Sequence, residues 1–331
     1  MPLHFVSTSP HYMTLTHTER VISRMQILVT GGAGFIGSHI VDQYIAAGHD
    51  VAVVDNLWEE GGGKEANLNP KAHFYRVDIT DEADLNIVFD EVRPEIVNHQ
   101  AAQHSVAIST KNPKLDARVN VLGLLNVLTN CTRVGTRKII FASSGATYGT
   151  PARLPIDEEV AQRPESPYGI TKMVTEYYLR YWQVAHGLTY TALRYGNVYG
   201  PRQDPNGEAG VIAIFAKRFL THQFVRIDWD GEQQKDYVYV GDVARANLLA
   251  LDRGDNDIFC IATGKGASVN QLYEELAKIT GYRPEIVRAP KRPGDIYLAY
   301  FNCSKAERIL GWKPEVTLEE GIKATVDFFR K

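Results

Sequence analysis

The chain has 331 residues, of which 44% are hydrophobic and 23% are charged, and its formal net charge is −3. This composition is typical of a globular protein, and it provides no excess of positive charge to attract nucleic acid or an anionic membrane. No apolar run approaches the roughly 18 residues of a membrane span. Cys131, Cys260 and Cys303 lie far apart without a CxxC or metal-ligand spacing, so we expect buried thiols in a reducing compartment, the cytoplasm.

Residues 1–24 differ from the rest of the chain. They are rich in His, Ser and Thr, and they lack the order of basic and then apolar residues that marks a signal peptide. A second methionine, Met25, directly precedes the first expected strand. We therefore predict that residues 1–24 are a disordered extension or an upstream start, and that the folded protein begins at Met25.

Strand patterns and helix patterns alternate from Met25 to about Tyr199. This alternation predicts βαβ crossovers and a parallel sheet covered on both faces, which is an α/β fold of the Rossmann-type, doubly wound class. Residues 25–199 form the predicted first domain, with strands at 27–29, 51–54, 73–77, 95–98, 138–142 and 189–193 and helices at 35–47, 81–92, 116–134 and 168–186.

The segments after Tyr199 are shorter and more mixed. A loop at 200–207 comes first, and helices are expected at 211–221, 240–251, 269–280 and 318–329. We predict that residues 200–331 form a smaller mixed α/β C-terminal lobe over the carboxyl edge of the sheet, where open α/β sheets bind ligands. Strands and helices that cross between the two lobes are compatible with this pattern.

A glycine-rich turn follows the first expected strand and opens the first helix. Gly31, Gly34 and Gly37 are spaced as GxxGxxG. Glycines let the backbone turn sharply and approach a pyrophosphate, while the helix N-terminus supplies amide donors and partial positive charge. The turn predicts a dinucleotide site, although such a cluster by itself also fits a purely structural turn.

Asp55 ends the second expected strand, where an acidic side chain can accept hydrogen bonds from the adenosine ribose. A carboxylate there repels a 2′-phosphate, so the predicted cofactor is NAD and not NADP. The alternative is that Asp55 and Asn56 only form a turn. Asp78, after the third strand, is a candidate to accept a hydrogen bond from the adenine amino group.

Tyr168 and Lys172 occur at positions i and i+4 of an expected helix, so their side chains share one face. An unperturbed tyrosine has a pKa of about 10 and is a poor base at neutral pH, but a nearby cation lowers that pKa and makes proton transfer feasible. The alternative for such a pair is a solvated helix face. The segment 142–149 adds hydroxyl groups just past the fifth strand, and it favours the catalytic interpretation.

In combination these motifs resemble the extended short-chain dehydrogenase/reductase superfamily, and within it the NAD-dependent sugar-nucleotide epimerases of the UDP-glucose 4-epimerase type. The similarity covers nearly all of residues 25–331. It is carried by residues 30–37, 55–57, 78–79, 99–109, 120–123, 143–149, 168–172, 194–202 and 292–295.

The resemblance implies roles for individual residues. Ser144, in preference to Ser143, would be the catalytic hydroxyl, and Tyr168 would be the base. Lys172 would bind the nicotinamide ribose and lower the Tyr168 pKa, and Asn120 would help to order the site. The implied NAD-binding set is Gly31, Gly34, Phe35, Ile36, Gly37, Asp55, Asn56, Asp78, Ile79, Gln100, Ala101, Ala102, Tyr168, Lys172 and Tyr195.

The implied reaction is the reversible 4-epimerisation of a UDP-hexose, either the UDP-glucose/UDP-galactose pair or its N-acetylated counterpart. Tyr168 takes the hydroxyl proton as hydride passes to tightly bound NAD, and the 4-keto sugar turns and takes hydride back on its other face. Related 4,6-dehydratases carry an Asp-Glu pair directly after the catalytic hydroxyl residue, and related UDP-glucuronate decarboxylases carry a Glu in this region. Here Gly145 and Ala146 provide no proton-transfer group, which favours epimerisation.

Two alternatives stay open. The nearer one is another NAD-dependent nucleotide-sugar enzyme, such as a UDP-glucuronate 4-epimerase or a dTDP-sugar dehydratase. The more distant one is a non-catalytic NAD-binding protein on the same fold. The presence of Ser144, Tyr168 and Lys172 together argues against the second alternative, because a binding module does not need all three.

The resemblance also assigns a substrate site, with two departures from the family pattern. Lys235 stands where family members usually have Arg, and Gly196 stands where many epimerases have Phe. Ala299 is small, which in this family admits N-acetylated sugars, unless Tyr297 or Tyr300 fills the space. The implied UDP-sugar contacts are Val106, Ser144, Tyr168, Asn197, Gly210, Val211, Lys235, Arg292, Asp295 and Ala299, with the neighbouring loop residues Glu208 and Ala209.

Other conspicuous side chains receive plainer interpretations. His99 and His104 come without a carboxylate cluster, so we expect packing near the cofactor loop and no metal site. Family members often dimerise through the two helices that correspond to residues 116–134 and 168–186, so the resemblance implies a homodimer. The aromatic side chains of the second helix are expected in the core or in that interface: Tyr177, Tyr178, Tyr181 and Trp182.

Overall fold

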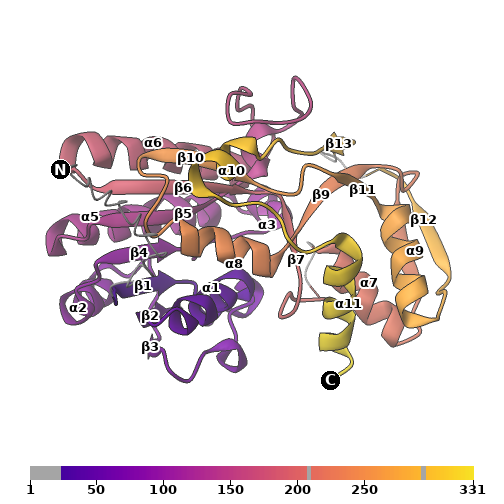
Figure 1. Ribbon diagram of the computed structural model, residues 1–331, viewed down its shortest axis with the longest axis horizontal. Coiled ribbons are helices and arrows are strands. Elements are labelled where there is room, and N and C mark those ends of the chain that lie inside the picture. The colour runs from indigo at the N-terminus through magenta and orange to yellow at the C-terminus, as the bar shows by residue number, and fades with distance from the viewer. Residues whose placement is uncertain (1–23, 207–209, 292–295) are drawn as a thin grey trace, which may run out of the picture.

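The computed structural model of the protein describes residues 24–206, 210–291 and 296–331 (Figure 1). Residues 1–23 of the predicted N-terminal extension lie outside these ranges. Arg24 is described, and its guanidinium pairs with the carboxylate of Asp50. Within the described ranges, no helix combines the length and the apolarity that a membrane crossing requires.

Seven parallel strands of the described chain form the main sheet, which confirms the predicted fold class. Their order is β3-β2-β1-β4-β5-β6-β10, so the direction of winding reverses between β1 and β4. Successive strand residues face opposite sides: Ile27 and Val29 pack in one core and Leu28 in the other. The strands are β1 (Gln26–Thr30), β2 (Asp50–Val54), β3 (His73–Tyr75), β4 (Ile96–His99), β5 (Lys138–Ser144), β6 (Thr189–Tyr195) and β10 (Asp257–Ile261).

Helices cover both faces of this sheet (Figure 1). On one face α1, α8 and α10 bury a core that contains Val41, Val243 and Leu310. On the other face α2, α5 and α6 bury a core that contains Phe89 and Leu124. The helices are α1 (Phe35–Ala46), α2 (Glu82–Val92), α5 (Gly123–Val134), α6 (Pro167–His186), α8 (Val240–Leu249) and α10 (Ser304–Leu310).

The later segments build a smaller lobe with its own core, which contains Phe219, Leu272 and Ile322 (Figure 1). Three helices pack there beside two small sheets, one in which β9 pairs with β7, β11 and β13, and one formed by β8 and β12. The elements are β7 (Asn197–Tyr199), α7 (Val211–Leu220), β8 (Val225–Asp228), β9 (Gln234–Tyr239), β11 (Gly266–Ser268), α9 (Val269–Thr280), β12 (Ile286–Ala289), β13 (Leu298–Ala299) and α11 (Leu318–Phe329).

Elements from the second half of the chain return to the main sheet. β10 pairs in parallel with β6 at the edge of the sheet. α8 shares its core with α1, and Tyr44 of α1 donates a hydrogen bond to the carbonyl oxygen of Asn247 in α8. The two lobes are therefore interleaved along the sequence, although each has a core of its own.

The helix predicted over residues 116–134 is wrong in its start and in its geometry. The chain instead forms α4 (Pro113–Ala117), a π-helical segment η3 (Arg118–Leu122) and then α5. π segments often occur at functional sites, and this one contains the buried Asn120. The sequence pattern also missed α3 (Val106–Lys111), where the Ser105 hydroxyl caps the helix by accepting a hydrogen bond from the Ile108 amide.

Candidate active site

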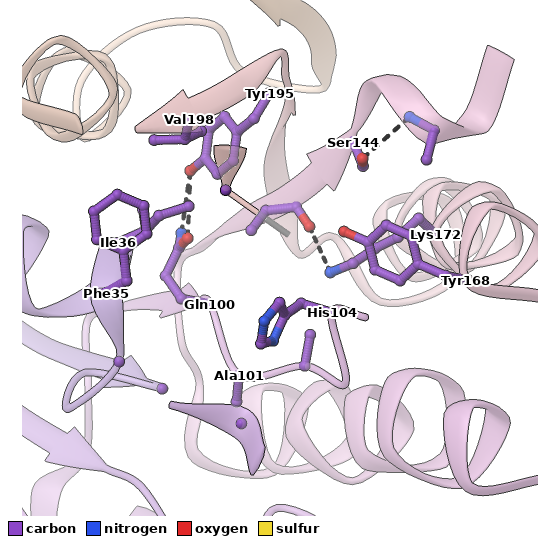
Figure 2. A pocket seen from close by; sticks show the side chains of 18 of the residues that line it. Phe35, Ile36, Gln100, Ala101, His104, Ser144, Tyr168, Lys172, Tyr195 and Val198 are labelled. Carbon is purple, nitrogen blue, oxygen red and sulfur yellow. Dashed lines mark hydrogen bonds between the residues drawn. The ribbon is translucent and has the colours of Figure 1, made fainter. Parts of the chain in front are cut away.

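A pocket of about 690 Å³ opens at the carboxyl ends of the central strands (Figure 2). Residues that follow or end β1, β2, β4, β5 and β6 line it, and residues of the smaller lobe close the opposite side. The winding reverses at this edge, and such switch points are where open α/β sheets bind ligands. All fifteen members of the predicted NAD-binding set line this pocket, so tertiary structure brings them together.

The glycine turn is built by close backbone contacts. Gly31 has a φ of 72°, and a Cβ atom on it would lie 2.6 Å from the amide nitrogen of Ala101. A Cβ atom on Gly37 would lie 2.1 Å from the carbonyl oxygen of Gly31. A side chain at Gly31 would collide with the loop after β4, and one at Gly37 would force the start of α1 away from the glycine turn. The N-terminus of α1 therefore stays open to the pocket, as a site for a pyrophosphate requires.

Asp55 is both a turn residue and a pocket residue. Its Oδ1 accepts a hydrogen bond from the Leu57 amide (2.9 Å), and its Oδ2 accepts one from the Ala33 amide (3.0 Å). Gly63 packs against this carboxylate, since a Cβ there would lie 2.7 Å from Oδ1. Burial raises the pKa of Asp55, while the two amide hydrogen bonds lower it. The carboxylate is thus fixed beside the glycine turn, where a ribose hydroxyl can reach its free lone pairs.

Asp78 is also held by its neighbours in the pocket wall. Its carboxylate accepts hydrogen bonds from the Asn56 side-chain amide (2.8 Å) and from the Thr80 amide and hydroxyl (2.8 Å each). These hydrogen bonds lower the pKa of Asp78 despite partial burial. Asn56, after β2, and Asp78, after β3, therefore form one polar wall of the pocket.

Tyr168 and Lys172 lie in the first turns of α6. The helix begins at Pro167 after Ser166, whose hydroxyl accepts a hydrogen bond from the Gly169 amide (3.1 Å), so the sequence Ser-Pro fixes the start of the helix. The Lys172 ammonium donates to the carbonyl oxygen of Ala142 at the end of β5 (2.7 Å) and lies 5.9 Å from the centre of the Tyr168 ring (Figure 2). The predicted pair therefore faces the predicted hydroxyl segment.

The two neighbouring serines of β5 have different surroundings. Ser143 is buried and donates its hydroxyl hydrogen to Glu176 (2.6 Å). Ser144 is less buried, accepts a hydrogen bond from the Ala146 amide (3.1 Å) and lines the pocket together with Tyr168. The structure thus supports the preference for Ser144 over Ser143 as the hydroxyl that a substrate can reach.

Burial has the largest effect on the ionisation of both Tyr168 and Lys172. Burial raises the pKa of Tyr168 to about 12, the hydrogen bond with Ser144 opposes this shift, and the negative charge of Asp116 adds to it. Burial also lowers the pKa of Lys172 to about 8, against the attraction of the Asp116 and Glu176 carboxylates. The pKa of Tyr168 therefore lies above its ordinary value in this structure because desolvation of the phenol dominates, and the lowering of this pKa by the Lys172 charge stays a prediction.

Asn120 lies behind the pocket and does not line it. Its side-chain oxygen accepts from the Gln103 amide (2.8 Å), and its side-chain nitrogen donates to the Gln103 carbonyl (2.9 Å), to Asp116 (3.1 Å) and to the Thr171 hydroxyl (3.2 Å). Thr171, next to Lys172, donates in turn to Asp116 (2.8 Å). Asn120 thereby ties the loop after β4 to α6, an arrangement suited to ordering the site.

The predicted substrate residues divide into two groups. Arg292 and Asp295, and the loop residues Glu208 and Ala209, lie outside the described residues. The others line the pocket together with the candidate catalytic residues Ser144, Tyr168 and Lys172; they are Val106, Asn197, Gly210, Val211, Lys235 and Ala299.

Three of these predicted substrate residues, Asn197, Lys235 and Ala299, are held in place by contacts within the smaller lobe. Asn197 donates to the carbonyl oxygen of Asp236 (3.3 Å), and the Lys235 ammonium donates to the carbonyl oxygen of Ile296 (2.7 Å). Ala299 on β13 pairs with Lys235 on β9. Within the described residues neither Tyr297 nor Tyr300 lines the pocket, and Tyr297 instead bonds to Asp230 (3.0 Å).

Close packing explains why positions 145 and 196 are glycines. A Cβ atom on Gly145 would lie 2.6 Å from the ring of Phe301, so the position after Ser144 cannot take a carboxylate side chain without moving that ring. A Cβ atom on Gly196 would lie 3.0 Å from the Cβ of Ala262 and 3.1 Å from the carbonyl oxygen of Asp236. Neighbouring backbone therefore disfavours the Phe that many epimerases have there.

Sequence reasoning missed several pocket residues, because no local motif marks them. They include Trp58, Val119, Gln203, Tyr237 and Phe301. For His104 the sequence predicts packing near the cofactor loop. It lines the pocket, and desolvation together with the charge of Lys172 lowers the pKa of its imidazole.

His99, in contrast, is a core residue. It bonds with the Thr30 hydroxyl (2.7 Å) and stacks on Phe141, and burial lowers its pKa to about 3. The imidazole is therefore neutral across the physiological range of pH.

The pocket residues fit the predicted cofactor. The glycine turn leaves room for a pyrophosphate, and Asp55 can accept hydrogen bonds from a ribose. Within the described residues the Lys172 ammonium donates one hydrogen bond, to Ala142, so two of its three N–H groups can serve a second ribose and Tyr168.

Comparisons with known proteins agree with this geometry. The NAD dependent epimerase/dehydratase family matches residues 27–262. The crystal structure of UDP-glucose 4-epimerase from Thermotoga maritima with UDP-glucose is 52% identical, with a TM-score of 0.90 over 92% of this chain and 99% of that one. The UDP-glucose 4-epimerase of Thermus thermophilus, in complex with NAD, is 44% identical, with a TM-score of 0.88 and the same coverage, 92% and 99%.

A third solved structure bears on the sugar. It is the UDP-N-acetylglucosamine 4-epimerase of Methanobrevibacter ruminantium in complex with UDP-N-acetylmuramic acid, which is 35% identical, with a TM-score of 0.87 over 93% of this chain and 98% of that one. These matches confirm the predicted family, enzyme class and fold class, and NAD as the cofactor of the family. The chain belongs to the NAD dependent epimerase/dehydratase family.

Proposed function

We propose that this protein interconverts UDP-glucose and UDP-galactose by inverting the configuration at carbon 4 of the hexose. The observation that carries the proposal is the convergence of Ser144, Tyr168 and Lys172 in one pocket with the glycine turn at Gly31–Gly37. The relatives named as UDP-glucose 4-epimerases, which match almost over their whole length, support the same reaction.

The chain's own residues can move the proton that the reaction requires. NAD, when bound, supplies the acceptor and donor of hydride, so the reaction causes no net oxidation. Tyr168 takes the proton of the sugar 4-hydroxyl and later returns it, and the Ser144 hydroxyl holds the same oxygen by a hydrogen bond. Lys172 stabilises the phenolate by its charge. A 4-keto sugar is the proposed intermediate, and it turns in the pocket before the proton and hydride return.

The described residues around the pocket disfavour a dehydratase. Elimination of water requires an acid and a base near carbons 5 and 6 of the sugar, and Gly145 and Ala146 provide neither. Phe301 occupies the space that a side chain at position 145 would need. A UDP-glucuronate 4-epimerase stays the nearest alternative, because it uses the same proton and hydride transfers.

We further propose that the pocket accepts the N-acetylated pair, UDP-N-acetylglucosamine and UDP-N-acetylgalactosamine. Ala299 presents only a methyl group to the pocket, and Tyr297 bonds to Asp230 and packs on Trp229. The similarity to a UDP-N-acetylglucosamine 4-epimerase supports this extension.

A substrate panel without added cofactor tests both parts. We expect the purified protein to convert UDP-glucose to UDP-galactose, and the N-acetylated pair as well, because NAD stays bound and is restored in each turnover. Products are identified by NMR, with UDP-glucuronate and a dTDP-hexose in parallel. A stable keto product, or turnover of UDP-glucuronate alone, contradicts the proposal. Turnover of UDP-glucose but not of UDP-N-acetylglucosamine contradicts only the proposal that the pocket also accepts the N-acetylated pair.

We also propose that the protein is a homodimer that joins through α5 and α6. Four side chains on α6 are exposed although they are largely apolar: Ile170 (46%), Tyr177 (65%), Tyr181 (57%) and Val184 (75%). Such a cluster on one helix is typical of an interface. The cytoplasmic location and the absence of nucleic-acid and membrane partners stay predictions from composition.

Sedimentation of the wild type and two variants tests the dimer. We expect the wild type to sediment as a dimer and Val184→Glu as a monomer, because the charge would be buried in the interface. Phe224→Glu is the control, since Phe224 is similarly exposed (52%) but lies in the smaller lobe. A monomeric wild type, or a dimer that both variants leave intact, contradicts the proposed interface.

A further inference from the structure

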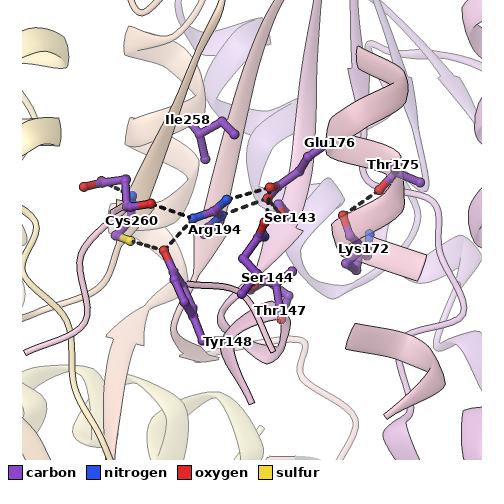
Figure 3. A network of polar contacts seen from close by, with 12 residues as sticks. Ser143, Ser144, Thr147, Tyr148, Lys172, Thr175, Glu176, Arg194, Ile258 and Cys260 are labelled. Atoms are coloured by element: carbon purple, nitrogen blue, oxygen red, sulfur yellow. Dashed lines mark hydrogen bonds and ion pairs between the residues drawn. The ribbon is translucent and has the colours of Figure 1, made fainter. Parts of the chain in front are cut away.

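A buried ion pair lies directly behind the proposed active site (Figure 3). Glu176 of α6 and Arg194 of β6 are 5% and 4% exposed, and two hydrogen bonds join them, at 2.9 Å to Oε1 and 2.6 Å to Oε2. Oε1 also accepts the Ser143 hydroxyl (2.6 Å), and Oε2 accepts the Gln162 side-chain amide (3.0 Å). This one carboxylate therefore connects α6, β5 and β6.

The order of residues along these three elements places the proposed catalytic groups beside the ion pair. Tyr168, Lys172 and Glu176 follow one another at steps of one helical turn and share a face of α6. Ser143 and Arg194 are register partners on β5 and β6, and so are the next residues, Ser144 and Tyr195.

Successive strand residues face opposite sides of the sheet, so the side chains of the two register pairs point in different directions. Ser143 and Arg194 turn toward α6 and meet Glu176. Ser144 and Tyr195 contribute to the pocket, which Ser143 also lines. A contact that fixes the first pair to α6 therefore also fixes the position of the second pair relative to the helix.

A further hydrogen bond extends the connection to the turn after Ser144. Arg194 donates to the Tyr148 hydroxyl (2.6 Å), and Tyr148 belongs to the short helix η4 (Gly145–Tyr148) that directly follows Ser144 (Figure 3). Ser144 is thus held from both sides along the chain, by Ser143 before it and by the turn at Tyr148 after it.

Stability alone is a weak reason for a buried ion pair. The desolvation of two charges commonly offsets their attraction, and apolar residues of similar volume often serve a core equally well. Catalysis has a stricter requirement, because a displacement of about 1 Å between reacting groups can cost about a hundredfold in rate.

We propose that Glu176 is a positioning residue, whose carboxylate fixes α6 to β5 and β6 and so holds Tyr168 and Lys172 in place against Ser144. The proposal rests on the proposed epimerase function, since it concerns the geometry of that site. Glu176 itself does not line the pocket.

Three variants test this role. Glu176→Gln places an amide nitrogen against donors from Arg194 and Gln162. Ser143→Ala removes only the link to β5 and leaves the ion pair intact. Lys138→Met is the matched control: Lys138 begins β5, its side chain is buried, and it donates to Asp255 (2.6 Å) and to the Arg253 carbonyl (2.8 Å) at the far end of the sheet.

The readouts are kcat and KM for UDP-glucose, together with the thermal midpoint. We expect Glu176→Gln to lower kcat about tenfold to a hundredfold and Ser143→Ala roughly threefold to tenfold, each with KM within about twofold of the wild type. Lys138→Met should lower the thermal midpoint and leave kcat within about twofold, since it removes a buried ammonium group and its hydrogen bonds away from the site.

The outcomes separate the two proposals. If the wild type turns over no UDP-sugar, the proposed function fails. The positioning role fails if the wild type is active and both variants keep the wild-type kcat, provided that Glu176→Gln folds. An equal loss of kcat in Lys138→Met also overturns it, because the effect would then be general destabilisation. If Glu176→Gln does not fold, Ser143→Ala alone decides between these outcomes.

Discussion

Tyr168→Phe will lower kcat for UDP-glucose epimerisation by about a thousandfold, or about 4 kcal/mol of transition-state stabilisation, and will leave KM nearly unchanged. The phenyl ring fills the same volume, so the pocket keeps its shape. The phenol hydroxyl is lost, and with it the group that takes and returns the sugar proton. The measurement is steady-state kinetics in both directions of the reaction.

Tyr190→Phe is the control for this experiment. Tyr190 is buried near the start of β6, at the end of the sheet away from the pocket, so removal of its hydroxyl should leave kcat as it is. Epimerisation by Tyr168→Phe at the wild-type rate contradicts the assignment of Tyr168 as the acid–base group. A similar loss in both variants also contradicts it, since the hydroxyl at 168 would then have no special role.

Gly37→Ala will abolish the retention of NAD during purification. The added methyl group would lie 2.1 Å from the Gly31 carbonyl oxygen and 2.8 Å from the Gly31 carbonyl carbon, both of them backbone atoms. Because backbone cannot turn aside as a flexible side chain can, the start of α1 must move away from the glycine turn. The site for the pyrophosphate opens, and we expect at least a tenfold loss of bound NAD, measured by enzymatic assay of the denatured protein.

Gly48→Ala provides the matched control at the other end of the same helix. Gly48 has a φ of 89°, so alanine is strained there too, but no atom lies within 4 Å of the added Cβ. This variant should lose some stability and retain NAD. Wild-type NAD content in Gly37→Ala would show that the close contact at the glycine turn does not control the cofactor site.

Much of the cofactor side of the pocket follows from the sequence alone. The glycine spacing, the acidic residue that ends the second strand and the alternation of strands and helices are local patterns, and each has a direct geometric meaning. The α/β class and the places of Gly31, Gly37 and Asp55 were therefore predictable. The i, i+4 spacing of Tyr168 and Lys172 likewise determines that both face one side of α6.

The tertiary structure decided what depends on residues far apart in the chain. β10 joins the main sheet only because its partner β6 leaves an open edge. Phe301 excludes a side chain at Gly145 from more than 150 positions away, and no local pattern indicates that contact. The π segment around Asn120 likewise depends on its buried hydrogen bonds with Gln103 and Thr171, which helical periodicity does not show.

The ionisation of Tyr168 shows the same division. Its spacing from Lys172 was readable in the sequence and suggested a lowered pKa, yet burial raises that pKa to about 12. The partners that decide the balance, Ser144 and Asp116, come from separate elements. Local motifs determined which chemical groups this protein carries at the edge of its sheet. Only packing between distant segments decided how those groups are desolvated and held, because both depend on what surrounds them in space.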